Sequence, residues 1–258
     1  MMDTSVKFSF FLALRRALGM LFGTLLILLR HLPAVIKRDV PIKHVQSWHK
    51  LMCKHGGLDV VWEGKPCDEK NVMYVSNHVS YIDIPVMGTE LNAWFVAKSE
   101  VRGWPGFGFL AELGKTVFIE RRSRRAADQK NQFAELLSQG RNLIVYPEGT
   151  STDGTDVAPF KPTLFEAVFS ETETPIKVQP FSITYCKFNG QRLPESMRDY
   201  YAWYGDMTLG DHFWHWLGLG RIEVRLRFHD PVTKHDFDDR KDMAKYCENI
   251  VRKDLQDY

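Results

Sequence analysis

The chain has 258 residues, of which 44% are hydrophobic and 26% charged, and its 34 basic and 32 acidic side chains leave a net charge of +2. This length is enough for one sizeable α/β domain with a large core. The nearly balanced charge does not indicate a nucleic-acid partner. Four cysteines without C-x-x-C spacing predict neither a disulfide framework nor a zinc knuckle.

The N-terminal stretch, residues 6–36, is mostly apolar. Its cleanest run, residues 17–29, is shorter than the roughly 20 apolar residues that a simple membrane span needs. Arg15 and Arg16 precede this run and Arg30 follows it, which favours a helix lying in the membrane interface with its cations reaching lipid phosphates. A true span, a cleaved signal peptide and a soluble core helix are the alternative interpretations.

Beyond this stretch, strand-like and helical patterns alternate. Helices are predicted at residues 42–55, after Pro85, and at 109–113, 126–138, 162–169 and 238–255. Strands are predicted at residues 58–62, 72–75, 93–97, 116–119, 143–146, 176–185 and 222–228. The alternation predicts an α/β fold, with a mixed, mostly parallel sheet flanked by helices. We expect membrane-associating helices in residues 1–55 and one globular domain in residues 56–258, with an aromatic-rich insertion of no clear period at 189–220.

A histidine and an aspartate five positions apart follow the strand predicted at residues 72–75. A neutral imidazole at His78 could take a proton from a hydroxyl, and a carboxylate at Asp83 could fix its tautomer. The two side chains can meet if His78 lies in a strand-to-helix turn and Asp83 in the first helical turn. Such pairs also arise by chance, so a hydrogen-bonded structural histidine is the competing interpretation.

Residues 146–151, Tyr-Pro-Glu-Gly-Thr-Ser, follow another strand and predict a turn with exposed backbone donors. Glu148 could orient a cation or a hydroxyl, and Thr150 could bind a phosphate oxygen. An ordinary turn is the alternative.

Two cations also stand next to predicted strands. Arg121 follows the strand at 116–119, and its guanidinium fits phosphate well, although a solvated basic loop would have the same composition. Lys98 ends the strand at 93–97 and could hold a phosphate, polarise a carbonyl or simply face solvent. The sequence has no G-x-S-x-G elbow and no P-loop or dinucleotide-binding motif.

These blocks, in this order, resemble the glycerolipid acyltransferases related to 1-acyl-glycerol-3-phosphate acyltransferase. The matching segments are Asn77-His-x4-Asp83, Gly114-x3-Phe-Ile-Glu-Arg121, Pro147-Glu-Gly-Thr150 and Val178-Gln-Pro180, with Ala97-Lys98 between the first two. The resemblance covers residues 58–235. Each block is weak alone, and their order and spacing make the match specific.

The resemblance implies a role for each candidate residue. His78 would be the general base on the acceptor hydroxyl and Asp83 its orienting partner. Arg121, Glu148, Gly149 and Thr150 would organise the acceptor's phosphate, and Lys98 would help to stabilise the oxyanion. The donor would be an acyl thioester of coenzyme A or acyl carrier protein, with no metal and no bound cofactor. The enzyme would work on membrane lipid at the cytoplasmic face of the inner membrane, with residues 1–55 as its membrane helices.

The acceptor implied first is 1-acyl-glycerol-3-phosphate, which would give phosphatidic acid. However, Ser151 stands where arginine is frequent in the family, which weakens one phosphate contact. The stretches 149–161 and 203–207 also resemble bacterial members that acylate lyso-ornithine lipid or another lysophospholipid. An inactive lipid-binding protein and a lipid hydrolase are hypotheses of other classes.

Overall fold

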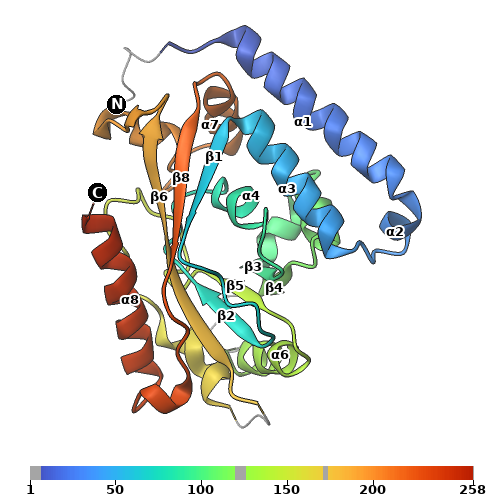
Figure 1. The fold of residues 1–258 in the computed structure, drawn as a ribbon. Coiled ribbons are helices and arrows are strands. Elements are labelled where there is room, and N and C mark those ends of the chain that lie inside the picture. The colour runs from blue at the N-terminus through green and yellow to red at the C-terminus, as the bar shows by residue number, and fades with distance from the viewer. Residues whose placement is uncertain (1–6, 120–125, 171–173, 258) are drawn as a thin grey trace.

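The computed structural model describes residues 7–119, 126–170 and 174–257, which form one twisted sheet between layers of helices (Figure 1). Within these residues, the eight-stranded sheet has the order β1-β8-β6-β2-β5-β3-β4, and the short β7 pairs with β6. The strands are β1 Leu58–Glu63, β2 Val72–Val75, β3 Trp94–Lys98, β4 Val117–Ile119, β5 Leu143–Val145, β6 Lys177–Phe188, β7 Gln191–Arg192 and β8 Ile222–Phe228.

The pairing is mostly parallel, as the sequence predicts. β2 pairs in parallel with β5 and β6, β3 pairs in parallel with β4 and β5, and β1 pairs in parallel with β8. Among the named strands of the described residues, only the pairs of β6 with β8 and with β7 are antiparallel. The mixed, mostly parallel sheet is therefore confirmed.

The centre of the sheet is buried on both faces, which explains the continuous apolar run of β2. Val72 and Tyr74 belong to the core on one face, whereas Met73 and Val75 belong to the core on the other. Figure 1 shows α8 on one face and α3 and α4 on the opposite face. The helices and 3-10 turns are α1 Phe10–Arg30, α2 Leu32–Ile36, α3 Ile42–Gly56, α4 Asp83–Met87, η1 Ser99–Gly103, α5 Phe107–Leu113, α6 Ala126–Ser138, η3 Pro162–Phe169, η4 Glu195–Tyr200, α7 Leu209–Leu217, η5 Lys234–Asp236 and α8 Arg240–Gln256.

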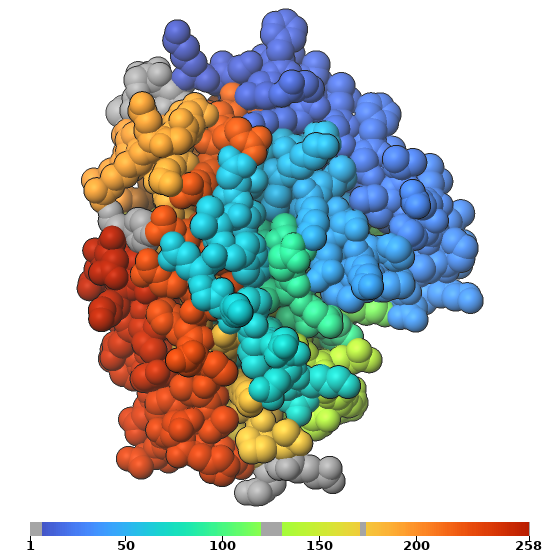
Figure 2. All heavy atoms as spheres, viewed as in Figure 1, coloured from blue at the N-terminus to red at the C-terminus, as the bar shows by residue number. Residues whose placement is uncertain are grey.

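Helix α1 lies outside α3 and is the element farthest from the sheet on its side (Figure 1). It is long and apolar enough to cross a membrane by length and composition, yet its inner side packs on the rest of the chain. Trp48 Nε1 of α3 donates to Thr24 Oγ1 at 2.9 Å. The outer side exposes a row of large apolar side chains, Phe11, Leu14, Leu18, Leu21, Phe22, Leu25, Leu26 and Leu29. In the space-filling view this segment forms a ridge along one side of the molecule (Figure 2).

Arg16 of α1 is buried and does not reach outward as the sequence analysis expects. Its guanidinium donates to the carbonyl oxygens of Leu217, Leu219 and Gly220, at 3.2, 2.7 and 3.2 Å, at the C-terminal end of α7. Leu217 is the last residue of α7 and the other two residues follow closely, so the cation lies at the C-terminal end of the helix, where the helix dipole favours positive charge. Arg16 therefore attaches α1 to the globular part of the chain.

Three other local features add to what the sequence predicts. Residues 162–169 are helical as predicted, and the helix is of the 3-10 type, with Pro162 at its start. The insertion at 189–220 contains α7, whose short aromatic run shows no recognisable period in the sequence. β6 continues three residues beyond the predicted strand, because β8 and β7 pair with its extension.

Candidate active site

Three parallel strands place the predicted site residues along one edge of the sheet. β2, β5 and β3 are neighbours and run in the same direction, so their carboxyl ends meet at that edge. His78 lies in the loop after β2, residues 147–150 follow β5, and Lys98 is the last residue of β3. Ligands of open α/β sheets bind at this kind of edge.

His78 and Asp83 are directly hydrogen-bonded. The His78 Nδ1 atom lies 2.8 Å from Asp83 Oδ2, and Asp83 is the first residue of α4, as the sequence analysis expects. The Asp83 side chain is fully buried, whereas that of His78 is 20% exposed. Because an ionised carboxylate only accepts hydrogen bonds, the neutral imidazole that fits this contact carries its proton on Nδ1 and has a lone pair on Nε2.

Four donors compensate the buried charge of Asp83. Besides His78, the backbone N–H groups of Val79 and Ser80 donate to Oδ2, at 2.8 and 3.0 Å. The Tyr185 hydroxyl of β6 donates to Oδ1 at 2.7 Å. Burial, together with the charge of Asp83, raises the pKa of Tyr185 well above its ordinary value, so this hydroxyl remains a donor. The carboxylate therefore has one well-defined position.

The Pro-Glu-Gly turn contacts the histidine loop through Glu148. Its Oε1 accepts the backbone N–H of His78 at 2.6 Å, and its Oε2 accepts that of Ala158 at 2.7 Å. Glu148 is 3% exposed, and burial raises its pKa to about 7 although the two backbone hydrogen bonds lower it. Its carboxylate oxygens are thus occupied in positioning the loop that carries the imidazole.

Two further contacts hold this loop on the sheet. Asn77 exchanges hydrogen bonds with the backbone of Ile183, at 3.0 and 2.9 Å, and so continues the contact between β2 and β6 where the strands diverge. The Tyr146 ring stacks on the His78 ring with a centroid distance of 3.9 Å. The imidazole is therefore held against an aromatic face.

The insertion at 189–220 contacts the same loop. The backbone N–H of Trp203 donates to the Val79 carbonyl at 2.9 Å. Tyr81 Oη lies 2.9 Å from His212 Nδ1, and His212 Nε2 lies 3.1 Å from the Ala202 carbonyl. His212 is buried, and burial lowers its pKa to about 4. The His212 ring therefore lies in the core as a neutral hydrogen-bonded group.

The remaining predicted residues are more exposed or lie outside the described part of the chain. Gly149 adopts a positive φ of 73° in the turn, which glycine tolerates best, and Thr150 is exposed beside it. Lys98 is exposed at the end of β3. Arg121 lies outside the described residues. In the described ranges 7–119, 126–170 and 174–257, no three His, Cys, Asp or Glu side chains are grouped as metal ligands would be.

Sequence reasoning missed several residues that hold the site together, Tyr146, Tyr185, Ala158, Trp203 and His212. Tyr185 is 102 positions from Asp83 and reaches it only through the register of β6. No local pattern could reveal this contact. Gln179, in the last of the matching segments, is buried and hydrogen-bonds the backbone of Lys65, Cys67 and His229.

The chain is similar to several known proteins. The Acyltransferase family model matches residues 53–184. The lyso-ornithine lipid O-acyltransferase of Brucella abortus is 36% identical over 225 residues, which cover 85% of this chain and 83% of that protein. The 1-acyl-sn-glycerol-3-phosphate acyltransferase of Neisseria meningitidis is 29% identical over 199 residues, or 76% of this chain and 73% of that protein.

The crystal structure of the 1-acyl-sn-glycerophosphate acyltransferase PlsC from Thermotoga maritima has a similar fold. It superimposes with a TM-score of 0.67 at 24% identity and covers 95% of each chain. This likeness supports the arrangement of one mostly parallel sheet flanked by helices.

Proposed function

This chain belongs to the Acyltransferase family, with relatives that acylate lysolipids, and we propose that its acceptor is the hydroxyl of lyso-ornithine lipid. The sequence analysis expects 1-acyl-glycerol-3-phosphate first and lyso-ornithine lipid as the alternative. The order is reversed here because four relatives that match 76–92% of this chain at 30–36% identity are lyso-ornithine lipid O-acyltransferases. Ser151, in place of a frequent arginine, also favours an acceptor without a phosphate. 1-Acyl-glycerol-3-phosphate is the second candidate, supported by the Neisseria relative.

The observation that carries the mechanism is the hydrogen bond between His78 and Asp83. With Nδ1 bonded to the carboxylate, Nε2 can accept the proton of the acceptor hydroxyl. The hydroxyl oxygen then attacks the thioester carbonyl, and the thiolate of coenzyme A or acyl carrier protein leaves. Asp83 stabilises the imidazolium, as the acid of a catalytic triad does.

The other site residues have supporting roles in this proposal. Lys98 stabilises the oxyanion from the end of β3, where a preorganised charge is most effective. Glu148 acts indirectly by fixing the His78 backbone. Gly149, Thr150 and Arg121 seat the phosphate if the acceptor carries one. The reaction needs no bound cofactor, and we place it at the cytoplasmic leaflet, where acyl thioesters are available.

An acyl-transfer assay with His78→Ala tests this mechanism. Purified protein in vesicles is supplied with labelled acyl thioester and either lyso-ornithine lipid or 1-acyl-glycerol-3-phosphate. We expect the variant to lose at least about 100-fold in rate, because general-base catalysis contributes about that much. His235→Ala, on an exposed histidine of η5, is the matched control and should retain the wild-type rate.

The assay also separates the other classes of function. A near-normal rate in the His78 variant would exclude the proposed base. Release of free fatty acid by the wild type without any acceptor would identify a hydrolase. Lipid binding without turnover of either acceptor would indicate an inactive lipid-binding protein.

A further inference from the structure

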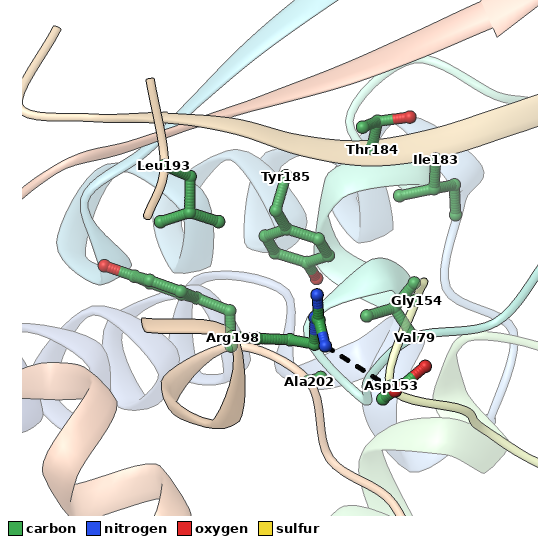
Figure 3. A pocket seen from close by; sticks show the side chains of 10 residues that line it. Val79, Asp153, Gly154, Ile183, Thr184, Tyr185, Leu193, Arg198 and Ala202 are labelled. Atoms are coloured by element: carbon green, nitrogen blue, oxygen red, sulfur yellow. Dashed lines mark ion pairs between the residues drawn. The ribbon is translucent and has the colours of Figure 1, made fainter. Parts of the chain in front are cut away.

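A small cavity of about 70 Å³ lies beside the loop that carries His78 (Figure 3). Val79, the residue after the histidine, forms part of its wall, and so does Tyr185, whose hydroxyl donates to Asp83. The cavity thus shares wall residues with the support of the histidine–aspartate pair. It has room for a small polar group but not for an acyl chain.

One cation and one anion face this cavity. Arg198 from η4 and Asp153, which follows the Pro-Glu-Gly turn, form an ion pair across it with a nitrogen–oxygen distance of 3.7 Å (Figure 3). The two side chains are 31% and 35% exposed. Such a long, half-exposed pair contributes little to stability, so a ligand can separate it at small cost. Arg198 also pairs with Glu195, which is 82% exposed.

Backbone hydrogen bonds fix both charges relative to His78. The N–H of Thr152, next to Asp153, donates to the His78 carbonyl at 2.9 Å. On the other side, Trp203 donates to the Val79 carbonyl, and the turn between Arg198 and Trp203 is closed by the bond from Ala202 N to Arg198 O. A headgroup held by these two charges would therefore be held at a set distance from the base.

Because a positive and a negative group stand together, the cavity complements a zwitterion better than a phosphate. A guanidinium binds a carboxylate through two parallel hydrogen bonds, and a carboxylate binds an ammonium. A phosphate would meet Asp153 as a like charge. We propose that Arg198 binds the carboxylate and Asp153 the side-chain ammonium of an N-acylated amino-acid lysolipid. This inference rests on the proposed function, since it states how the same site selects its acceptor.

The inference is tested with acceptors that lack one of the two charged groups and with protein variants that lack the side chain proposed to bind that group. Lyso-ornithine lipid is compared with the same hydroxyacyl chain on norvaline, which lacks the ammonium, and on 1,4-diaminobutane, which lacks the carboxylate. Arg198→Gln should raise KM for lyso-ornithine lipid at least about tenfold, because charged hydrogen bonds are worth that much. It should change KM for the diaminobutane analogue less than about twofold, since that analogue has no carboxylate to lose.

Asp153→Asn should show the reciprocal pattern. KM should rise for lyso-ornithine lipid and for the diaminobutane analogue, whereas KM for the norvaline analogue should stay within about twofold. In both variants kcat should remain close to the wild-type value. A general structural defect would instead raise KM for all three acceptors and lower kcat.

Arg221→Gln and Asp59→Asn provide the controls, because they break an exposed ion pair between the neighbouring strand β1 and the residue before β8. These variants should leave all three KM values unchanged.

If the wild type acylates lyso-ornithine lipid but Arg198→Gln leaves KM unchanged, or raises KM equally for every acceptor, the headgroup inference fails alone. If the wild type acylates only 1-acyl-glycerol-3-phosphate, both the proposed acceptor and this inference fail. If it acylates no lysolipid, the proposed acyl transfer itself fails.

Discussion

At the scale of single residues, the site depends on two buried carboxylates, and each of their oxygens accepts at least one hydrogen bond. Asp83 accepts four hydrogen bonds and Glu148 accepts two from the backbone. The sequence could predict that His78 and Asp83 meet, because five positions suffice to bring them together at a strand-to-helix turn. It could not predict the contact of Tyr185 with Asp83 or the two backbone donors to Glu148, because these contacts depend on the packing of distant segments.

Glu148 should make stability depend on pH. Burial raises its pKa from 4.5 to about 7, so the folded state binds a proton between these values that the unfolded state has released. This contribution is fully present below pH 4.5 and is lost as pH rises to about 7. The free energy of unfolding should therefore fall across this window, by at most about 3 kcal/mol.

Urea denaturation followed by tryptophan fluorescence from pH 4.5 to 8 checks this expectation. Glu148→Gln should remove that part of the pH slope, since an amide does not titrate. Glu90→Gln, on an exposed carboxylate paired with Lys50, should keep the wild-type slope. A wild type and a Glu148 variant with equal slopes would contradict the raised pKa.

At the scale of elements, α1 shows which features of a helix can be predicted from composition and which cannot. The apolar run and its flanking arginines predict a membrane-associated helix, and the structure has an outer face of exposed leucines and phenylalanines. The sequence alone could not show that Arg16 is buried whereas Arg15 is exposed, because only the fold brings the end of α7 to Arg16. The opposite case is β2, where four buried residues in a row sufficed to predict the strand.

The exposed face of α1 should carry most of the membrane affinity. We expect Leu26→Glu with Leu29→Glu to release the protein from vesicles, because both side chains are 67% exposed and each loses its apolar contact with lipid. Vesicle flotation measures the bound fraction. The control Asn249→Glu with Gln256→Glu adds two charges to exposed positions of α8, on the opposite face of the sheet, and should float like the wild type. Equal flotation of both double variants would place the membrane contact elsewhere.

At the scale of the whole molecule, both ends of α1 contact the rest of the folded chain. Ser9, its N-cap, donates from its backbone N–H to the Gly218 carbonyl. At the other end, His31 stacks on His44 of α3 with a ring distance of 3.5 Å. A helix that crossed the bilayer would put its two ends on opposite sides. We therefore propose that residues 1–55 form a one-sided membrane anchor for the domain at 56–258.

Protease-cleavable tags at the two chain termini test this orientation in inside-out membrane vesicles. Both tags should be cleaved from the outside of these vesicles, which corresponds to the cytoplasmic face. A periplasmic protein sealed inside the same vesicles serves as the protected control. Protection of the N-terminal tag alone would indicate that α1 spans the membrane.

The attachment of α1 to α7 has a mechanical consequence for the reaction centre. Arg16 holds the end of α7, His212 projects from that helix to the Tyr81 hydroxyl, and Tyr81 lies between the histidine and the aspartate in the chain. Two hydrogen-bonded contacts and a short chain segment thus connect the apolar outer helix to the proton acceptor. Solvents or detergents that separate α1 from α7 should therefore lower the rate of acyl transfer at concentrations that leave the sheet folded.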